Sequence, residues 1–159
     1  MEYSINDFKK FLIDAKKATY ASQGDDASVV PYFNGSKQLE YQMEDFKYRD
    51  IYYGTSFFIG QEVVEYKEKP IWSMIYSGGI IITDLSREQI FEIYRFLREA
   101  MKLVDLESLY RGPKFFEEQE YVYKNEFKGK LDNFWGDETI EKNGFLIYEL
   151  RYSGGIIKD

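Results

Sequence analysis

The six-residue segment YSGGII occurs twice in this chain, at Tyr76–Ile81 and again at Tyr152–Ile157. Because average usage is near one residue in twenty, two identical hexamers should arise by chance on the order of once in several thousand chains of this length. The two copies are 76 residues apart (152 minus 76). At this offset, residues 58–81 align with 134–157 without a gap, and 11 of the 24 aligned positions are identical. The repeat therefore predicts an internal duplication with roughly 80 residues per copy.

The similarity continues upstream of this match. With one inserted residue the offset becomes 75, so that Tyr48 falls on Tyr123. Further back, DFKKFLIDAKK (7–17) resembles EIYRFLREAMK (92–102). Both segments carry apolar residues at helical spacing and both are preceded by a serine with capping-box character, so each copy is predicted to begin with a helix.

Strand-like alternation follows the first predicted helix. The paired glycines of YSGGII are predicted to end or kink the last strand of each copy, where the backbone approaches closely or takes positive φ. Asn143-Gly144 is a strong signal for a two-residue hairpin turn in the second copy. The predicted strands of the first copy are 39–43, 46–53, 57–66 and 71–76.

The predicted fold class is α+β. We expect a tandem duplication of a unit made of one helix and an antiparallel β-meander, with a pseudo-twofold axis between the copies. The whole chain, 1–159, is expected to form a single domain of two repeats, 1–81 and 86–159.

Composition excludes several classes of chemistry. The chain has no cysteine and no histidine, so it lacks thiolate ligands, a cysteine nucleophile and the commonest general base. Its net charge of −7 makes free nucleic acid a poor partner, since phosphate binding needs a basic surface. We therefore expect no catalytic residue, no metal, no cofactor and no direct nucleic-acid partner.

The sequence also lacks membrane and export signals. No apolar run is long enough to cross a membrane. The N-terminal MEYSINDFKK does not have the basic and then apolar character of a signal peptide. We expect a cytoplasmic protein with no membrane partner.

One candidate binding motif is Phe-x-Gly-x-Glu, which occurs at Phe58–Glu62 and at Phe134–Glu138. On an extended strand, its Phe, Gly and Glu share one face. The glycine would leave a gap between a ring and a carboxylate, and an organic cation gains from both. The alternative is a β-bulge glycine beside a solvated glutamate.

A second candidate is a row of aromatic side chains on one sheet face. Charged residues at 149 and 151 alternate with the row in the second copy, so the row should face the helices or a pocket. Tyr48 shares its strand face with Asp50, whereas the nearest basic residues, Arg49 and Lys124, lie on the other face. The alternative is core packing with hydroxyl groups at the rim. The row comprises Tyr48, Trp72, Tyr76, Tyr123, Trp135, Tyr148 and Tyr152.

Three further features lead to separate predictions. Two carboxylates could meet near the axis, as in a hydrolase, from the set Glu62, Glu65, Glu138 and Glu141. However, alternation puts Glu62 and Glu65 on opposite strand faces, and nothing fixes a separation across the copies. Lys16-Lys17 is predicted to be part of the solvated face of the first helix. The segment 22–38 has no periodicity, and we expect it to be mobile and to close over the pocket.

Several segments are distinctive in combination: FLIDAKKATYASQG, EDFKYRDIYYG, FIGQEVV, KPIWSMIYSG, YRGP and LRYSGGIIK. Together they cover nearly the whole chain and resemble an uncharacterised bacterial domain family, some members of which look like the C-terminal part of helix-turn-helix regulators. The resemblance implies a sensing domain, here without a DNA reader before residue 4. The architecture is also distantly similar to gyrase-inhibitor-like ligand-sensing domains, although no diagnostic motif of that family is present.

The leading functional prediction is a non-enzymatic small-molecule-binding domain of the sensor or effector type, with an aromatic and acidic pocket between the repeats. The expected ligand is small and hydrophobic or cationic. The alternatives are a protein-protein interaction or homodimerisation module that uses a sheet edge or aromatic patch, and, third, a carboxylate-dependent hydrolase.

Overall fold

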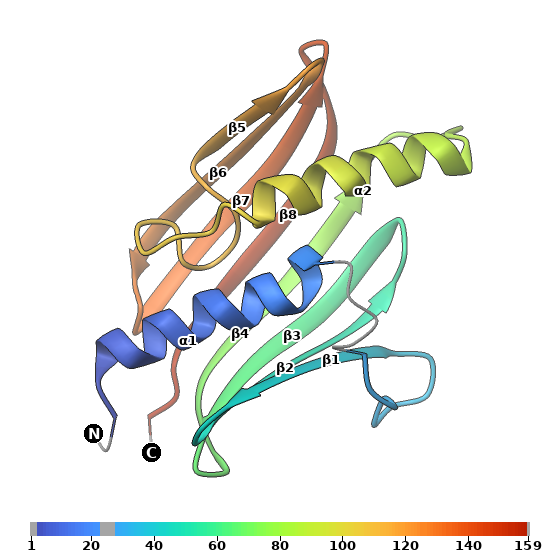
Figure 1. Cartoon of the computed structure of the whole chain (residues 1–159). Helices are drawn as coiled ribbons and strands as arrows, with labels where there is room; N and C mark the ends of the chain where they lie inside the picture. The colour runs from blue at the N-terminus through green and yellow to red at the C-terminus, as the bar shows by residue number, and fades with distance from the viewer. Residues whose placement is uncertain (1–2, 23–27, 159) are drawn as a thin grey trace.

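The computed structural model describes residues 3–22 and 28–158. Its centre is an antiparallel sheet of eight strands in the order β1-β2-β3-β4-β8-β7-β6-β5. Consecutive strands pair within each half of the chain, and β4 pairs with β8 in the middle (Figure 1). The strands are β1 Lys37–Met43, β2 Phe46–Gly54, β3 Phe57–Tyr66, β4 Lys69–Ile80, β5 Phe115–Glu118, β6 Tyr121–Lys130, β7 Asn133–Lys142 and β8 Phe145–Ile156.

Two helices, α1 (Ile5–Ala18) and α2 (Arg87–Met101), lie on the same face of the sheet (Figure 1). Both begin where the sequence predicts. The Ser4 hydroxyl accepts hydrogen bonds from the first turn of α1, and Ser86 forms a reciprocal capping box at the start of α2. A short 3₁₀ turn, η1 (Tyr20–Ser22), follows α1.

The two YSGGII segments lie side by side at the centre of the sheet. Tyr76 is the direct partner of Tyr152 in the β4–β8 ladder. The strands run through their paired glycines to Ile80 and Ile156, so the glycines do not end the strands, whereas the close backbone approach predicted for them is present. Their role is close approach, because a Cβ at Gly154 would lie 2.3 Å from the Ser73 carbonyl oxygen.

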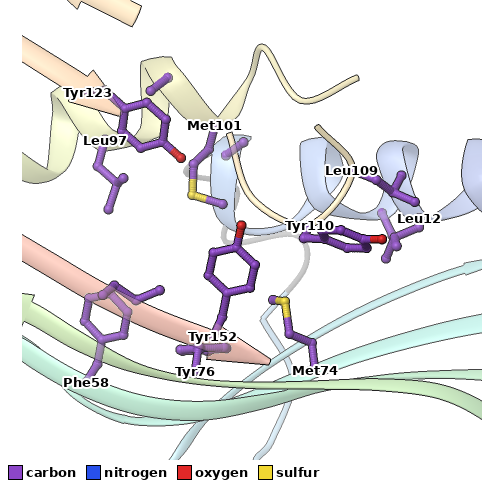
Figure 2. Packing of buried hydrophobic residues seen from close by; sticks show 14 of the residues in the cluster. Leu12, Phe58, Met74, Tyr76, Leu97, Met101, Leu109, Tyr110, Tyr123 and Tyr152 are labelled. Atoms are coloured by element: carbon purple, nitrogen blue, oxygen red, sulfur yellow. The ribbon is translucent and has the colours of Figure 1, made fainter. Parts of the chain in front are cut away.

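The core lies between the helices and the facing side of the sheet (Figure 2). The inward row of β4 and β8 is buried, including Met74 and Leu150, whereas Ile75 and Arg151 of the alternate row are exposed. The predicted direction of these two strands is therefore correct. Trp135 is an exception to the predicted row, because it is 51% exposed on the outer face while its neighbour Phe134 points inward.

The fold class is α+β, as predicted, and most of the regular structure is sheet. The turn of the second half also forms as predicted: Asn143 and Gly144 both take positive φ and join β7 to β8. Within the described residues, no helix is long and apolar enough to cross a membrane.

Candidate functional site

The principal cavity near buried ionisable groups, here called the α2 pocket, lies between α2 and the strands β1 to β4. Its volume is about 320 Å³, at the lower end of the range for small-molecule sites. α1 and η1 close its inner end, and Arg111 from the segment after α2 reaches it from the other half. The sheet contributes Lys37, Tyr48, Asp50, Tyr52, Phe58, Glu62 and Tyr76 to its lining.

Asp50 is the most unusual side chain of the α2 pocket. It is 3% exposed and accepts a 2.6 Å hydrogen bond at Oδ1 from the Tyr76 hydroxyl, the only hydrogen bond to its side chain from a described residue. No ion pair in the described part of the chain includes it. Burial and the negative charge of Glu62 raise the pKa of Asp50 to about 7, against the opposing effects of Tyr76 and Lys16.

Glu62 lies directly across the β2–β3 ladder from Asp50, on the same face. Its Oε2 accepts a 2.5 Å charged hydrogen bond from Nζ of Lys16, which extends from α1. Both side chains are almost fully buried. Burial lowers the pKa of Lys16, and the charge of Glu62 opposes that effect. The two charges compensate each other inside the protein.

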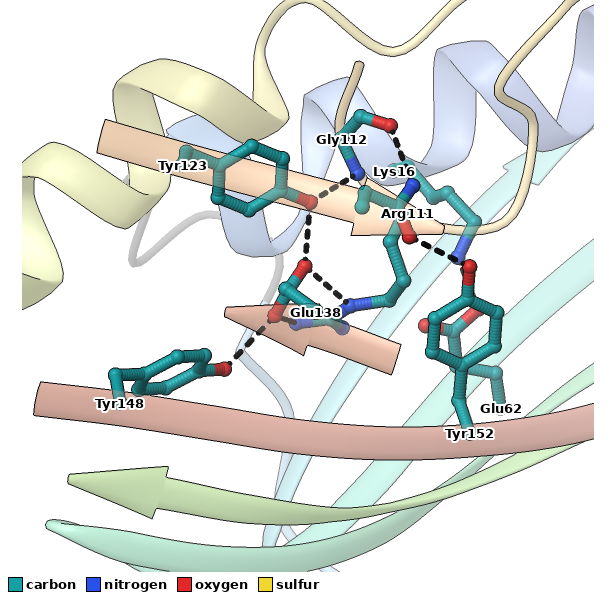
Figure 3. Close-up of polar contacts among 9 residues, drawn as sticks. Lys16, Glu62, Arg111, Gly112, Tyr123, Glu138, Tyr148 and Tyr152 are labelled. Carbon is teal, nitrogen blue, oxygen red and sulfur yellow. Dashed lines mark hydrogen bonds and ion pairs between the residues drawn. The ribbon is translucent and has the colours of Figure 1, made fainter. Parts of the chain in front are cut away.

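Glu138 occupies the corresponding place in the second half and is fully buried (Figure 3). Arg111 donates to it from Nη2 at 2.9 Å and from Nε at 3.1 Å. The hydroxyls of Tyr123 and Tyr148 donate at 2.6 and 2.8 Å. Burial acts to raise the pKa of Glu138, but the charge and hydrogen bonds of these partners outweigh it, so the pKa lies below its usual value.

Asn125 faces Glu138 across the β6–β7 ladder, as Asp50 faces Glu62. Tyr152 donates to its Oδ1 at 2.7 Å, and its amide donates to Ser108 and to the carbonyl of Gly112. Asn125 is therefore satisfied by protein groups on both sides. The segment 105–113 lies against Asn125 through Ser108 and Gly112, and its Leu109 and Tyr110 pack in the core (Figure 2).

The structure brings some of the predicted site residues together and separates others. Four of the ten line the α2 pocket: Tyr48, Phe58, Glu62 and Tyr76. Three of the remaining six lie together in the second half: Tyr123 and Tyr148 donate to Glu138, which Arg111 also binds. Tyr152 bonds Asn125. The last two, Trp72 and Phe134, stack on each other in the core at 5.9 Å.

The gap expected at the glycine of Phe-x-Gly-x-Glu is absent in both copies of the motif. A Cβ at Gly60 would lie 2.4 Å from the Tyr76 hydroxyl, and one at Gly136 would lie 2.5 Å from that of Tyr152. The tyrosine of the adjacent strand fills each space. Both glutamates also have internal cationic partners, so the charge expected to attract a cationic ligand is compensated.

Sequence reasoning missed those cationic partners. Lys16 was assigned to the solvated face of its helix, yet it is 2% exposed. A signal was present, because Phe8, Leu12 and Lys16 recur every four residues on the buried stripe. Arg111 comes from an irregular segment, and no periodicity predicts where its side chain points. Asp50 was correctly expected to share the face of Tyr48.

The loop prediction applies only in part to described residues. Residues 23–27 lie outside them. The part that follows is joined to β1 by the backbone hydrogen bond from Val29 to Gln38. Tyr32 and Phe33 line a groove on the outer face of the sheet, so this part of the loop does not cover the α2 pocket.

No group of three acidic side chains within residues 3–22 and 28–158 is arranged to hold a metal ion.

Comparison with known proteins gives a family but no activity. A family model described as a domain of unknown function (DUF5680) matches residues 50–157, which is more than half of the chain. The chain belongs to this family. The resemblance to an uncharacterised domain family is thereby confirmed, and the DUF5680 match spans the sheet from Asp50 through β8. No curated protein and no solved structure matches the chain.

Proposed function

We propose that this DUF5680 domain binds a small molecule in the α2 pocket and serves as a sensor or effector-type domain rather than as an enzyme. The observation that carries the proposal is Asp50. A buried carboxylate with one hydrogen bond and no ionic partner is costly to the fold unless something else binds it. Its second oxygen belongs to a side chain that lines a pocket, where a ligand can supply the missing donor.

The walls of the pocket support a binding role. Ligand sites are mostly apolar with a few convergent polar groups. Phe58 and Tyr52 provide rings from the sheet, and Phe91 and Tyr94 provide rings from α2. The Tyr94 hydroxyl donates a hydrogen bond to the carbonyl of Ser56, so this ring is held in place at the pocket wall.

A hydrolase is less well supported. A glycosidase needs two carboxyl groups that are both available to the substrate. Asp50 and Glu62 are neighbours across the ladder, but Lys16 binds Glu62 and compensates its charge. Glu62 and Glu138 each serve a separate internal ion pair. Among the described residues that line the pocket, Asp50 is therefore the one uncompensated acid, and they provide no second free carboxylate for the reaction.

We infer in addition that the chain is one domain made of two duplicated units, 1–81 and 86–159, related by a pseudo-twofold axis. Support comes from the β4–β8 register, in which Tyr76 pairs with its own repeat equivalent. Further support comes from the strand irregularities at Val64/Glu65 and Ile140/Glu141, which are 76 residues apart. On this proposal the α2 pocket lies between the copies, since α2 belongs to the second.

The binding proposal is tested by a screen of fragment-sized aromatic compounds, followed by amide chemical-shift mapping. Binders should shift resonances near Tyr52, Thr55 and Tyr94, which surround the pocket. They should leave resonances near Tyr32 and Phe33, in the groove on the outer face, unchanged. The proposal fails if no compound acts on the first group, or if all binders act on the second.

An interaction module remains the second candidate, because the outer face carries an apolar groove of about 630 Å³. Tyr32, Phe33 and Ile59 on it are all more than half exposed. Exposed apolar groups of this kind often mark protein-protein contacts. Sedimentation of the wild type and of Ile59→Glu tests this candidate. A dimer that the substitution dissociates would support it, and a monomer at all concentrations would argue against homodimerisation.

A further inference from the structure

Among the described side chains at the inner end of the α2 pocket, the net charge is minus one when Asp50 is ionised. Lys16 compensates Glu62, and Arg111 compensates Glu138, so these four side chains sum to zero. Asp50 adds its own charge when it is ionised. Its pKa of about 7 means that the charge is present above neutral pH. A ligand that reaches this end meets an acceptor oxygen in a desolvated setting, where a charged hydrogen bond is strong.

The mouth of the pocket has the opposite sign. Lys37 of β1 and Arg87 of α2 are exposed there. Water and salt screen exposed charges, whereas the buried carboxylate is screened much less. The mouth therefore weakens binding of a single positive charge only slightly. It opposes ligands that carry several positive charges along their length.

Size and shape restrict the ligand further. A volume of about 320 Å³ suits a single ring with a short substituent. The rings of Tyr52, Phe58, Phe91 and Tyr94 line the space between the mouth and Asp50. An aromatic body would pack on these side chains while its polar end points inward.

We propose, resting on the binding function proposed above, that the α2 pocket takes a small single-ring aromatic compound with one positively charged nitrogen group, such as an aryl amidine or a benzylic amine, and that an N–H of this group donates to Asp50. The Tyr76 hydroxyl donates to Oδ1 of Asp50, and on this proposal Oδ2 accepts from the ligand. Aromatic carboxylates of the same size should be rejected by the ionised Asp50. Polyamines should be rejected at the mouth.

The test uses the full chain and four probes: benzamidine, benzyl alcohol, benzoate and spermidine. Affinities are measured by amide-shift titration at about pH 8 and about pH 5.5, on either side of the pKa of Asp50. The variants are Asp50→Asn, which copies the chemistry of Asn125, and Asp137→Asn. The latter removes the same charge from an exposed ion pair with Arg151 on the outer face.

Benzamidine should bind at least about tenfold more tightly than benzyl alcohol at the higher pH, and benzoate and spermidine should not occupy the pocket. Asp50→Asn, or protonation of Asp50 at the lower pH, should weaken benzamidine roughly 10- to 100-fold, and Asp137→Asn should not. If benzoate binds as well as benzamidine, or if neither Asp50→Asn nor pH changes the preference, the ligand class is wrong although the pocket still binds. If no probe shifts resonances near Tyr52 or Tyr94, this inference fails, and failure of the wider fragment screen as well would remove the proposed function.

Discussion

Replacement of Asp50 by Asn should make this protein more stable at alkaline pH. The folded state holds the proton of Asp50 with a pKa of about 7, compared with an ordinary value of 3.8. Each pKa unit corresponds to about 1.36 kcal/mol, so the difference amounts to on the order of 4 kcal/mol. That free energy opposes folding whenever the carboxyl group must ionise inside the protein.

The sign follows from proton linkage. Because the pKa is raised in the folded state, the contribution of Asp50 to stability is fully present below about pH 4 and is lost as pH rises through about 7. Asn keeps the neutral form at every pH. It also keeps an oxygen for the Tyr76 hydroxyl, as Asn125 does for Tyr152 at 2.7 Å. The variant should therefore match the wild type in acid and exceed it by up to about 4 kcal/mol at pH 8.

Urea unfolding at a series of pH values from about 4 to about 8 provides the assay, with the difference in unfolding free energy between variant and wild type as the readout. Asp137→Asn is the control, since this exposed carboxylate should change stability by less than about 0.5 kcal/mol. A difference between Asp50→Asn and wild type that is independent of pH, or a variant less stable than wild type at pH 8, would refute the reasoning.

Three further predictions concern the second ion pair, the central seam and the loop. Arg111→Met should lower the free energy of unfolding by about 3–5 kcal/mol at neutral pH, because it leaves Glu138 buried without a cation. Addition of Glu138→Gln should recover part of this loss in urea unfolding. A double variant less stable than the single one would contradict this. Gly154→Ala should cost at least about 2 kcal/mol in the same assay, because the new Cβ would clash with the facing strand. Gly144→Asn should cost less than about 1 kcal/mol, because this turn position has positive φ and open space around it. Equal losses would contradict the close-approach argument. Amides in 28–36 should exchange faster than those of β2 and should not slow when a ligand fills the α2 pocket, because Tyr32 and Phe33 line the outer-face groove; strong protection of this segment in the free protein would contradict this.

Much of the fold was predictable because local signals and the repeat agreed. Serine N-caps set both helix starts, with a full capping box at Ser86, and alternation set the strands. Charged residues at 149 and 151 fixed which face of β8 is buried. Trp135 shows where the reasoning failed: its neighbour Phe134 already occupied the inward position, and strict alternation should have placed the indole outside. The strands also continue through their glycines. The glycines let neighbouring strands approach closely, and this does not require either strand to end.

The site was less predictable, because its polar partners come from different elements. Tyr48 and Asp50 were correctly placed on one face by alternation within a single strand. The partner of Glu62 comes from α1, and that of Glu138 comes from an irregular segment. Sequence periodicity describes one element at a time, so it gives no account of contacts across elements. The paired glutamates therefore looked available for a ligand when each was already bound inside the fold.

The difference between the two halves is itself an argument about function. Both halves place a glutamate, a tyrosine from the adjacent strand and a short polar residue in the same arrangement. Where protein fills the space, the short residue is Asn125, neutral and fully hydrogen-bonded. Where the space is open, it is Asp50, whose charge opposes folding above neutral pH. Asn125 demonstrates that an amide can occupy such a position and bond the tyrosine. A carboxylate at the open position is therefore not required by the fold, and stability lost at a site that faces a cavity is characteristic of residues that act on a ligand.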